Sequence, residues 1–426
     1  MSFFFYYMVQ ERYNNFLWNE VISKYKNLEM LDFFYSNQVY RYGNQFVVDL
    51  DKEPNHFKQQ FKEWMKEALC MKRILTEKSD NSNCKGIILS NGYFGINNYL
   101  EQLGYNTVIG PWWYRNKGNI VNSINYTHTF YSFKRQLNNL TFQESLSEKC
   151  DLLLEKLLVK TKVLFRENQF KAVFASGNGA FENRLPLRAA KEEGIPTFVF
   201  LHGIPTYYDD DPQRIDYLLV WSEQLKQNCI KYANFPAERI FVTGHPYYQS
   251  FNLRELRNSL DNILIINPNS NDGAQQDRGI LLLYMLMVEK VLRPLGVKSV
   301  RFRPHPGERA EWYLKYLDNN FFIPDTGPFV QAIEKSTLII GTSSTVLIEA
   351  IFHGVNYILF DPLGNDQWQH IVPPFDGSDS FLPIAKTEEA LASMIENHVC
   401  TNVELFHEYI KTPFDISFIS DLIEKK

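Results

Sequence analysis

Short apolar runs, each bounded by Gly, Pro, Asn or charged residues, recur along most of the chain. Such runs are typical of strands that are buried on both faces of a parallel sheet. In the first half they lie at residues 86–95, 106–113, 171–178, 196–203, 216–222 and 239–246. Segments with helical spacing, such as residues 184–194, separate several of them. Alternating strands and helices predict a parallel sheet that is covered by helices on both faces.

The same alternation begins again in the second half. Further apolar runs lie at residues 262–269, 297–307, 336–344 and 356–362. We therefore predict an α/β protein with two doubly wound, Rossmann-like domains that face a central cleft. The expected bounds are 1–250 for the first domain, 251–405 for the second, and 406–426 for a C-terminal helix that packs back on the first domain. Ligands of such sheets bind at the carboxyl ends of the strands, so the polar loops there are the candidate site.

Composition narrows the class of protein without identifying it. The 426 residues are 45% apolar and 22% charged, which excludes a globally disordered chain. A net charge of −5 without a long basic block argues against a nucleic-acid partner. Five scattered cysteines without a Cys-x-x-Cys motif, and no apolar run of membrane-spanning length, predict a cytoplasmic protein. At most it would contact the inner face of the cytoplasmic membrane.

One segment bears on that membrane contact. Residues 58–75 have the spacing of a helix with Lys and Arg on one face and Phe, Trp, Met and Leu on the other. Such a helix either lies on a membrane surface or packs its apolar face into the core. We expect core packing and keep peripheral membrane contact as the alternative.

A run of hydroxyl residues follows the apolar strand that ends near residue 341. Thr342, Ser343, Ser344 and Thr345 precede a helical segment, so their hydroxyls, free backbone N–H groups and the positive end of the helix dipole would converge. This arrangement predicts an anion site. Because it lacks the Lys and the spacing of a Walker loop, the expected guest is a phosphate or diphosphate ester. The alternative is an ordinary helix N-cap.

A histidine between two prolines follows another predicted strand. His305 is flanked by Pro304 and Pro306, which fix the backbone and favour a loop, and Arg303 lies just before them. An imidazole in such a loop can hydrogen-bond a phosphoryl oxygen and stabilise charge on a leaving group. The alternative is a core histidine bonded to a backbone carbonyl.

Further candidates stand at other strand ends. His202 and Gly203 follow a first-half strand and are interpreted equally well as cleft or structural residues. His245, near the join of the two halves, is interpreted as a hinge or turn residue. Asn267 and Asn269 open the second half, where they would contact a donor nucleotide.

A general base is harder to place. Transfer to a hydroxyl requires a group that accepts its proton. Glu182 and Asp209 are the carboxylate candidates in the first half, and their alternatives are a helix-start charge and a solvated loop. Asp209 and Asp211 have Asp-x-Asp spacing, but we expect no dedicated metal site.

Taken together, these His-Gly, Gly-His-Pro, His-Pro and Ser-Ser elements resemble bacterial glycosyltransferases of GT-B fold that use cytidine-activated donors. The resemblance covers about residues 170–365 and is nearest to sialyltransferases, polysialic acid capsule synthases and Kdo transferases; CDP-glycerol glycerophosphotransferases are further off. It implies that His305 and Pro306 bind the CMP moiety and that Ser343 and Ser344 bind its phosphate. Glu349 resembles the acidic residue that many GT-B enzymes aim at the donor ribose.

The resemblance implies an inverting, metal-independent transferase without a cofactor. It would move a sialic-acid-like sugar or Kdo from CMP to a hydroxyl of a capsule, lipooligosaccharide or O-antigen glycan, whose acceptor can be lipid-linked. The first domain would bind the acceptor and the second the nucleotide sugar. The sialyltransferases carry an acidic-acidic-Gly element that this chain lacks at a strand end, so the base stays open. Alternatives are a CDP-polyol phosphate transferase, a UDP-sugar 2-epimerase-like isomerase and a non-catalytic binding module.

Overall fold

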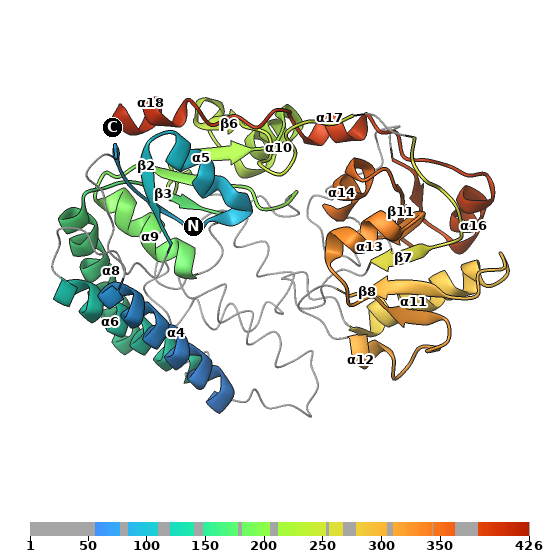
Figure 1. Ribbon diagram of the computed structural model, residues 1–426, viewed down its shortest axis with the longest axis horizontal. Coiled ribbons are helices and arrows are strands. Elements are labelled where there is room, and N and C mark those ends of the chain that lie inside the picture. Colours follow the sequence, from blue (N-terminus) through green and yellow to red (C-terminus); the bar gives the residue numbers. More distant parts are fainter. Residues whose placement is uncertain are drawn as a thin grey trace.

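The computed structural model describes residues 56–76, 84–109, 120–139, 148–177, 181–204, 212–252, 255–266, 278–304, 310–342, 344–362 and 382–425. Within these ranges the chain forms two sheets of six parallel strands, each at the centre of one domain (Figure 1). Candidate residues outside the described ranges are Asp209, Asp211, Asn267, Asn269, His305, Pro306 and Ser343.

The first sheet has the strand order β2-β1-β3-β4-β5-β6. Its strands are β1 (Gly86–Ser90), β2 (Tyr105–Val108), β3 (Phe170–Ala175), β4 (Thr197–Phe200), β5 (Tyr217–Val220) and β6 (Ile240–Val242). The chain moves outward to β2, then returns and continues on the other side of β1. The point at which the order reverses therefore lies between β1 and β3, and in open α/β sheets ligands usually bind at the strands' carboxyl ends beside such a point.

The second sheet has the order β12-β11-β10-β7-β8-β9, which is the strand order of the Rossmann fold. Its strands are β7 (Ile263–Ile266), β8 (Val300–Arg303), β9 (Phe322–Pro324), β10 (Leu338–Gly341), β11 (Asn356–Phe360) and β12 (Ile384–Ala385). Here the order reverses between β7 and β10.

Helices connect the strands and cover both sheets. Those of the first domain are α4 (His56–Thr76), α5 (Ile96–Gln102), α6 (Ile120–Asn139), α8 (Glu148–Asn168), α9 (Phe181–Glu192) and α10 (Glu223–Ala233), with the short 3-10 helices η1 (Tyr93–Gly95) and η2 (Ala237–Arg239). Those that follow are α11 (Arg278–Leu292), α12 (Ala310–Tyr313), α13 (Phe329–Lys335), α14 (Val346–Phe352), α16 (Glu388–Glu396), α17 (Leu405–Tyr409) and α18 (Ile419–Glu424).

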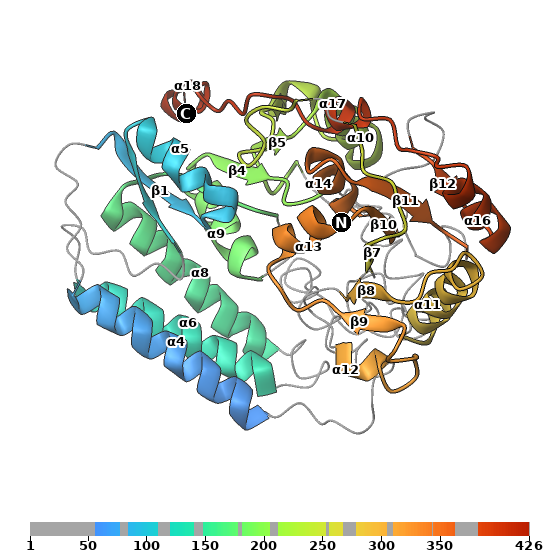
Figure 2. The ribbon, with the colours of Figure 1, turned by 45° about the vertical axis from the view of Figure 1, so that its right-hand side comes forward.

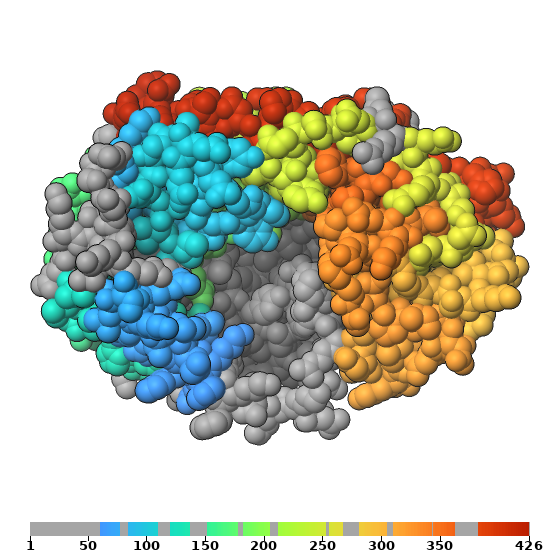
Figure 3. Space-filling view, viewed as in Figure 1, coloured from blue at the N-terminus to red at the C-terminus, as the bar shows by residue number. Residues whose placement is uncertain are grey.

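The predicted fold class is confirmed. Each of the ten apolar runs contains a strand, and the two sheets form two doubly wound domains. The space-filling view shows the first domain on the left and the second on the right (Figure 3). The sequence did not reveal β9 and β12, which are only three and two residues long. Such short strands at the sheet edges carry too little pattern to be recognised.

The two domains share a hydrophobic core. One cluster of buried side chains contains residues of the first sheet together with Leu264 and Ile266 of β7 and Leu347 of α14. Stacked rings continue the contact, with the centroids of Phe251 and Phe406 4.1 Å apart. The second domain is therefore packed against the first, which fixes the strand ends of one sheet relative to those of the other.

After α17 the chain runs along the first domain, as Figure 1 shows for α18. The Lys411 amide donates to the Trp221 carbonyl at 2.8 Å, and the Asp415 amide donates to the Thr243 carbonyl at 2.9 Å. These bonds tie the C-terminal segment to the carboxyl ends of β5 and β6. The bounds assigned to the domains stay a prediction.

The expectation that the apolar face of residues 58–75 packs into the core is wrong. In α4, Trp64 is 63% exposed and Leu69 55% exposed, whereas Glu63 and Glu67 are buried. The glutamates turn inward because Lys134 and Arg135 on α6 form ion pairs with them. None of the helices in the described ranges has the length and apolar character needed to span a bilayer.

Candidate functional site

The candidate site lies where the carboxyl ends of the two sheets face each other. His202 stands just after β4 and donates from Nδ1 to the Ser176 carbonyl oxygen, 2.8 Å away, at the end of β3. Asn91, which follows β1, donates to the Ser176 hydroxyl at 2.6 Å. These bonds join three neighbouring strand ends at the reversal point of the first sheet. Because Nδ1 carries the proton of the neutral ring, Nε2 of the exposed imidazole is left as an acceptor.

The next residues reach the second domain. The Ile204 amide donates to Oγ1 of Thr345 at 3.0 Å. A Cβ added to Gly203 would lie 3.3 Å from the same oxygen, so the absence of a side chain permits this close approach. The structure thus brings the predicted His-Gly element of the first domain to the hydroxyl run of the second.

The hydrogen bonds of the hydroxyl run, residues 342–345, differ from those expected of a set of free backbone amides. Val346 N–H, at the start of α14, donates to the Ser344 hydroxyl at 3.3 Å, and Leu347 N–H donates to the Ser344 carbonyl at 3.0 Å. The local turn therefore uses the amides of Val346 and Leu347, which do not point freely at an anion. Thr342 is buried, and its Oγ1 has no hydrogen-bond partner among the described residues.

Glu349 lies one turn into α14. Burial raises the pKa of its carboxyl to about 6. Burial, and then the Glu349 charge, raise the pKa values of Tyr247 and Tyr248, which places the carboxyl beside the turn between the domains. A carboxyl with this pKa can exchange a proton near neutral pH.

His245 is enclosed by aromatic rings. The centroids of Phe94, Trp221 and Tyr248 lie 4.2, 4.6 and 5.0 Å from that of the imidazole, which is 3% exposed. Its Nδ1 accepts from the Tyr247 amide at 3.1 Å, so Nε2 carries the proton. Burial lowers the pKa of His245 to about 3. The ring is therefore neutral, and it supports the turn that leads out of the first domain.

Sequence reasoning missed Tyr93 and Phe94. They form η1 after β1, and Phe94 has a φ of 51°, a left-handed conformation that is unusual for a residue with a bulky side chain. Phe94 packs on His245, and the Tyr93 ring lies 6.1 Å from that of His202. Tyr93 is 41% exposed at the reversal point of the first sheet. The flanking Gly92 and Gly95, in the last part of the predicted run 86–95, were the pattern that could have revealed them.

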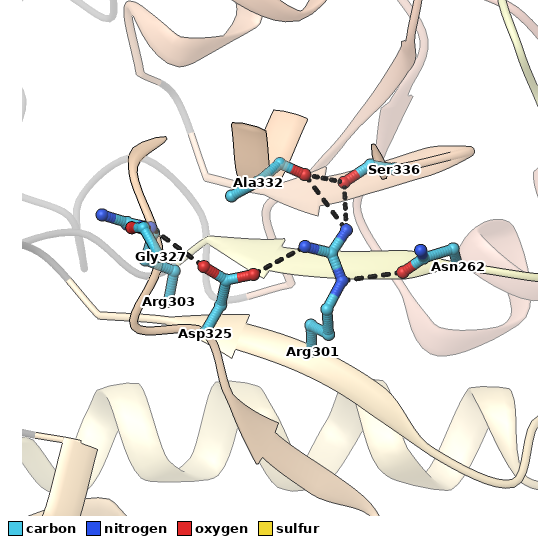
Figure 4. A network of polar contacts seen from close by, with 7 residues as sticks. All are labelled: Asn262, Arg301, Arg303, Asp325, Gly327, Ala332 and Ser336. Carbon is cyan, nitrogen blue, oxygen red and sulfur yellow. Dashed lines mark hydrogen bonds and ion pairs between the residues drawn. The ribbon is translucent and has the colours of Figure 1, made fainter. Parts of the chain in front are cut away.

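Arg301 and Arg303 leave the same face of β8 but have different surroundings (Figure 4). Arg301 donates to Asp325 at 2.6 Å, to Asn262 at 2.7 Å and to Ser336 at 2.7 Å. A fourth bond runs from Arg301 to the Ala332 carbonyl in α13, at 3.1 Å. Four of the five N–H groups of Arg301 are therefore used in this network. Arg301 therefore ties β7, β9 and α13 together.

Arg303 is held on one side only. Its Nη1 donates to Asp325 at 3.0 Å and to the Gly327 carbonyl at 2.7 Å, and its guanidinium lies 5.2 Å from the centre of the Phe329 ring. Within the described ranges its Nε and Nη2 donate to no residue. Because one carboxylate serves two guanidinium groups, an excess positive charge remains at this end of β8 among the described residues.

Glu182 begins α9, close to the end of β3. Its carboxylate lies 2.5 Å from Lys134 Nζ. Burial opposes ionisation, but the Lys134 charge prevails and lowers the pKa of Glu182. A paired carboxylate with a low pKa is a weak proton acceptor. Within the described ranges no three His, Cys, Asp or Glu side chains are grouped as a metal site would require.

Two facing Rossmann-like domains are the architecture of the GT-B fold, so that part of the predicted resemblance is confirmed. No protein-family model and no curated protein matches the chain. Similar solved structures include UDP-GlcNAc 2-epimerase from Neisseria meningitidis bound to UDP-GlcNAc, with 13% identity over 80% of this chain and 98% of that chain and a TM-score of 0.44. MurG of Acinetobacter baumannii has 15% sequence identity, covering 80% of this chain and 100% of that chain, with a TM-score of 0.45. The wall teichoic acid polymerase TagF has 14% sequence identity, covering 86% of this chain and 97% of that chain, with a TM-score of 0.42.

Proposed function

We propose that this chain is an enzyme that acts on a nucleotide-activated sugar or polyol held between its two domains. The contact from Ile204 to Thr345 is the observation that carries the proposal. It joins the strand ends of the first sheet to those of the second, and ligands of such sheets bind at these ends. A donor bound by one domain would therefore meet groups of the other.

The donor side would be the second domain. Arg303 offers N–H groups with no partner in the described ranges, and Asp325 and Gly327 hold its guanidinium in place. A preorganised guanidinium with an excess positive charge suits a phosphate. The hydroxyls of Thr342 and Ser344 would add hydrogen bonds, and Glu349 would bind a hydroxyl of the ribose. His305 and Ser343 belong to the same proposal on the sequence motifs.

The acceptor side would be the first domain. His202 is the better candidate for the base, because the Ser176 carbonyl orients its ring and leaves Nε2 able to accept a proton. Glu182 would first have to break its ion pair with Lys134. Asp209 stays a candidate on the sequence. The exposed ring of Tyr93 would stack against an acceptor sugar.

In the finer form of the proposal, the donor is an acidic sugar activated by CMP. The acceptor oxygen attacks the anomeric carbon while the bond from that carbon to the phosphate oxygen breaks. The acceptor proton passes to the base, CMP departs, and the configuration inverts. Arg303 and the hydroxyls would stabilise the charge on the departing phosphate, which makes a metal unnecessary.

A second candidate is an isomerase of the UDP-sugar 2-epimerase type. Glu349 favours it, because a half-buried carboxyl with a pKa of about 6 is suited to moving a proton on and off a bound sugar. A simple displacement needs no such group on the donor side. A CDP-polyol phosphate transferase would use the same donor site but would leave a phosphodiester in its product.

Nucleotide binding and product analysis test the proposal together. Thermal shift with CMP, CDP and UDP identifies the nucleotide, since a ligand that binds the folded state raises its melting temperature. The protein is then incubated with a CMP-sugar, CDP-glycerol or UDP-GlcNAc, with and without acceptor and EDTA. We expect turnover with one donor class, and His202→Asn should lower it at least ~10²-fold. His398→Asn, at an exposed position of the second domain, is the matched control.

The outcomes separate the candidates. CMP release that requires an acceptor supports the transferase, and a changed sugar without acceptor supports the isomerase. Absence of both nucleotide binding and turnover would overturn the proposal. Full activity of His202→Asn would remove its assignment as the base.

A further inference from the structure

Helix α4 turns both of its glutamates inward, together with Cys70 and Ile74, and exposes a stripe of large apolar side chains. Figure 1 and Figure 2 show α4 beside α6 at the edge of the first domain. Helices of soluble proteins usually bury their apolar stripe and expose the charged one. This orientation raises two questions: what stabilises the buried glutamates, and what covers the exposed apolar stripe.

Ion pairs hold the inward face in place. Lys134 lies 3.5 Å from Glu63, and Arg135 pairs with Glu67. His128 Nδ1 lies 2.8 Å from the other oxygen of Glu67. All three partners belong to α6. Both acidic side chains of α4 are thus buried and neutralised, so a simple rotation that buried the apolar face would leave them unpaired.

The outward face is a continuous apolar stripe. Its members are five large side chains, each about half exposed or more: Phe61 (56%), Trp64 (63%), Met65 (47%), Leu69 (55%) and Leu75 (58%). Four of them follow the i, i+3, i+4 and i+8 spacing that places residues on one side of a helix. Single exposed apolar residues are ordinary, but a contiguous stripe of this kind marks an interaction surface. Atoms of α4 lie at the surface in Figure 3.

The exposed charges in residues 61–76 of α4 have one sign. With Glu63 and Glu67 turned inward, the exposed ionisable side chains of this part of the helix are Lys62, Lys72 and Arg73, with Lys66 partly exposed. The whole chain carries a net charge of −5, so this surface is a local positive exception. An aromatic and aliphatic stripe with basic residues along it is the pattern of helices that lie in the headgroup region of anionic membranes.

We propose that the outward face of α4 docks on an anionic lipid surface, with Phe61 and Trp64 inserted among the headgroups and the basic residues on lipid phosphates. A second copy of the chain is the less suitable occupant. In a symmetric dimer the same patch meets itself, which would bring the Lys and Arg residues of both copies together. Anionic lipid neutralises them instead. The inference does not depend on the reaction that the cleft performs.

Vesicle flotation of the full chain tests this docking. Vesicles of phosphatidylcholine alone are compared with vesicles that also contain phosphatidylglycerol. We expect binding only to the second kind, weakening as salt is raised. The apolar variant Phe61→Ser/Trp64→Ser should lower partitioning at least ~10-fold, because it removes the inserted area. The charge variant Lys62→Gln/Arg73→Gln should lower it to a similar degree.

Matched controls and a second readout keep the result specific. Leu283→Ser/Leu286→Ser removes two exposed apolar side chains from α11 in the second domain and should leave binding unchanged. Brominated lipid should quench tryptophan fluorescence of the wild type but much less that of Trp64→Phe, which retains binding. This readout needs no destabilising change.

Several results would overturn the proposal. One is absence of binding by the wild type, and another is equal binding to neutral and anionic vesicles. A change in oligomeric mass in Phe61→Ser/Trp64→Ser would assign the face to a second copy. A large loss of thermal stability in that variant would show that the protein itself covers the stripe.

Discussion

His245 makes the stability of the first domain depend on pH in a way that can be calculated. In the folded chain its pKa is about 3, against an ordinary value of 6.5. Its neutral form is therefore favoured by folding. Above pH 6.5 neither state is protonated and the contribution is fully present. As the pH falls below 6.5, the unfolded chain takes up a proton that the folded chain refuses, so stability falls until the folded pKa is reached.

The size of the effect follows from this separation of pKa values. Between the two pKa values each pH unit removes about 1.4 kcal/mol from the free energy of unfolding, so the loss between pH 7 and pH 5 is about 2 kcal/mol. The imidazole is only 3% exposed, so solvent screening reduces this little. His245→Asn removes the titrating group but retains an acceptor for the Tyr247 amide. The cavity that it leaves among the rings destabilises the variant at every pH by about 1–3 kcal/mol.

Urea unfolding followed by fluorescence at several pH values measures both proteins. We expect the stability advantage of the wild type over His245→Asn to shrink by about 2 kcal/mol on going from pH 7 to pH 5. His398→Asn, at an exposed histidine, should run parallel to the wild type. A constant difference between wild type and His245→Asn across this range would refute the reasoning, because it would mean that the folded state protonates His245 as readily as the unfolded chain does.

Three further changes probe the cleft. Thr345→Val removes the acceptor of the Ile204 amide, so it should lower the free energy of unfolding by about 1 kcal/mol and, with it, the melting temperature. We also expect a clear loss of turnover, and unchanged turnover would contradict the proposed site. Arg303→Gln should weaken nucleotide binding at least ~10-fold in calorimetry, with little loss of thermal stability. Arg301→Gln should mainly lower the thermal stability, because it breaks four hydrogen bonds. The reverse result would mean that Arg301 binds the nucleotide and Arg303 has the structural role. Glu349→Gln should abolish an inflection near pH 6 in the kcat/KM profile, and an unchanged profile would show that this carboxyl is not the titrating group.

The contacts expected from the sequence differ most from those in the structure at the start of α14 and in β8. Hydroxyl residues before a helix indicated free amides, yet Ser344 satisfies the amide of Val346 through its own side chain. Arg301 and Arg303 look equivalent in the sequence, two positions apart on one strand. The folded chain surrounds Arg301 with Asn262, Asp325 and Ser336 and so gives it a structural role. Arg303 shares only Asp325 with it and keeps donors that have no partner among the described residues.

The sequence by itself determined the architecture. Apolar runs of strand length that alternate with helical segments, repeated in two series, are typical of parallel sheets covered on both faces, and the two doubly wound halves follow from that local pattern. Tertiary structure decided which face of α4 points inward, because the choice depends on Lys134 and Arg135, which lie far along the chain. It also decided that Gly203 meets Thr345 and that His245 is enclosed by rings. Periodicity reports how each segment divides into faces, whereas the partner of each face is set by contacts between residues that are distant in the sequence.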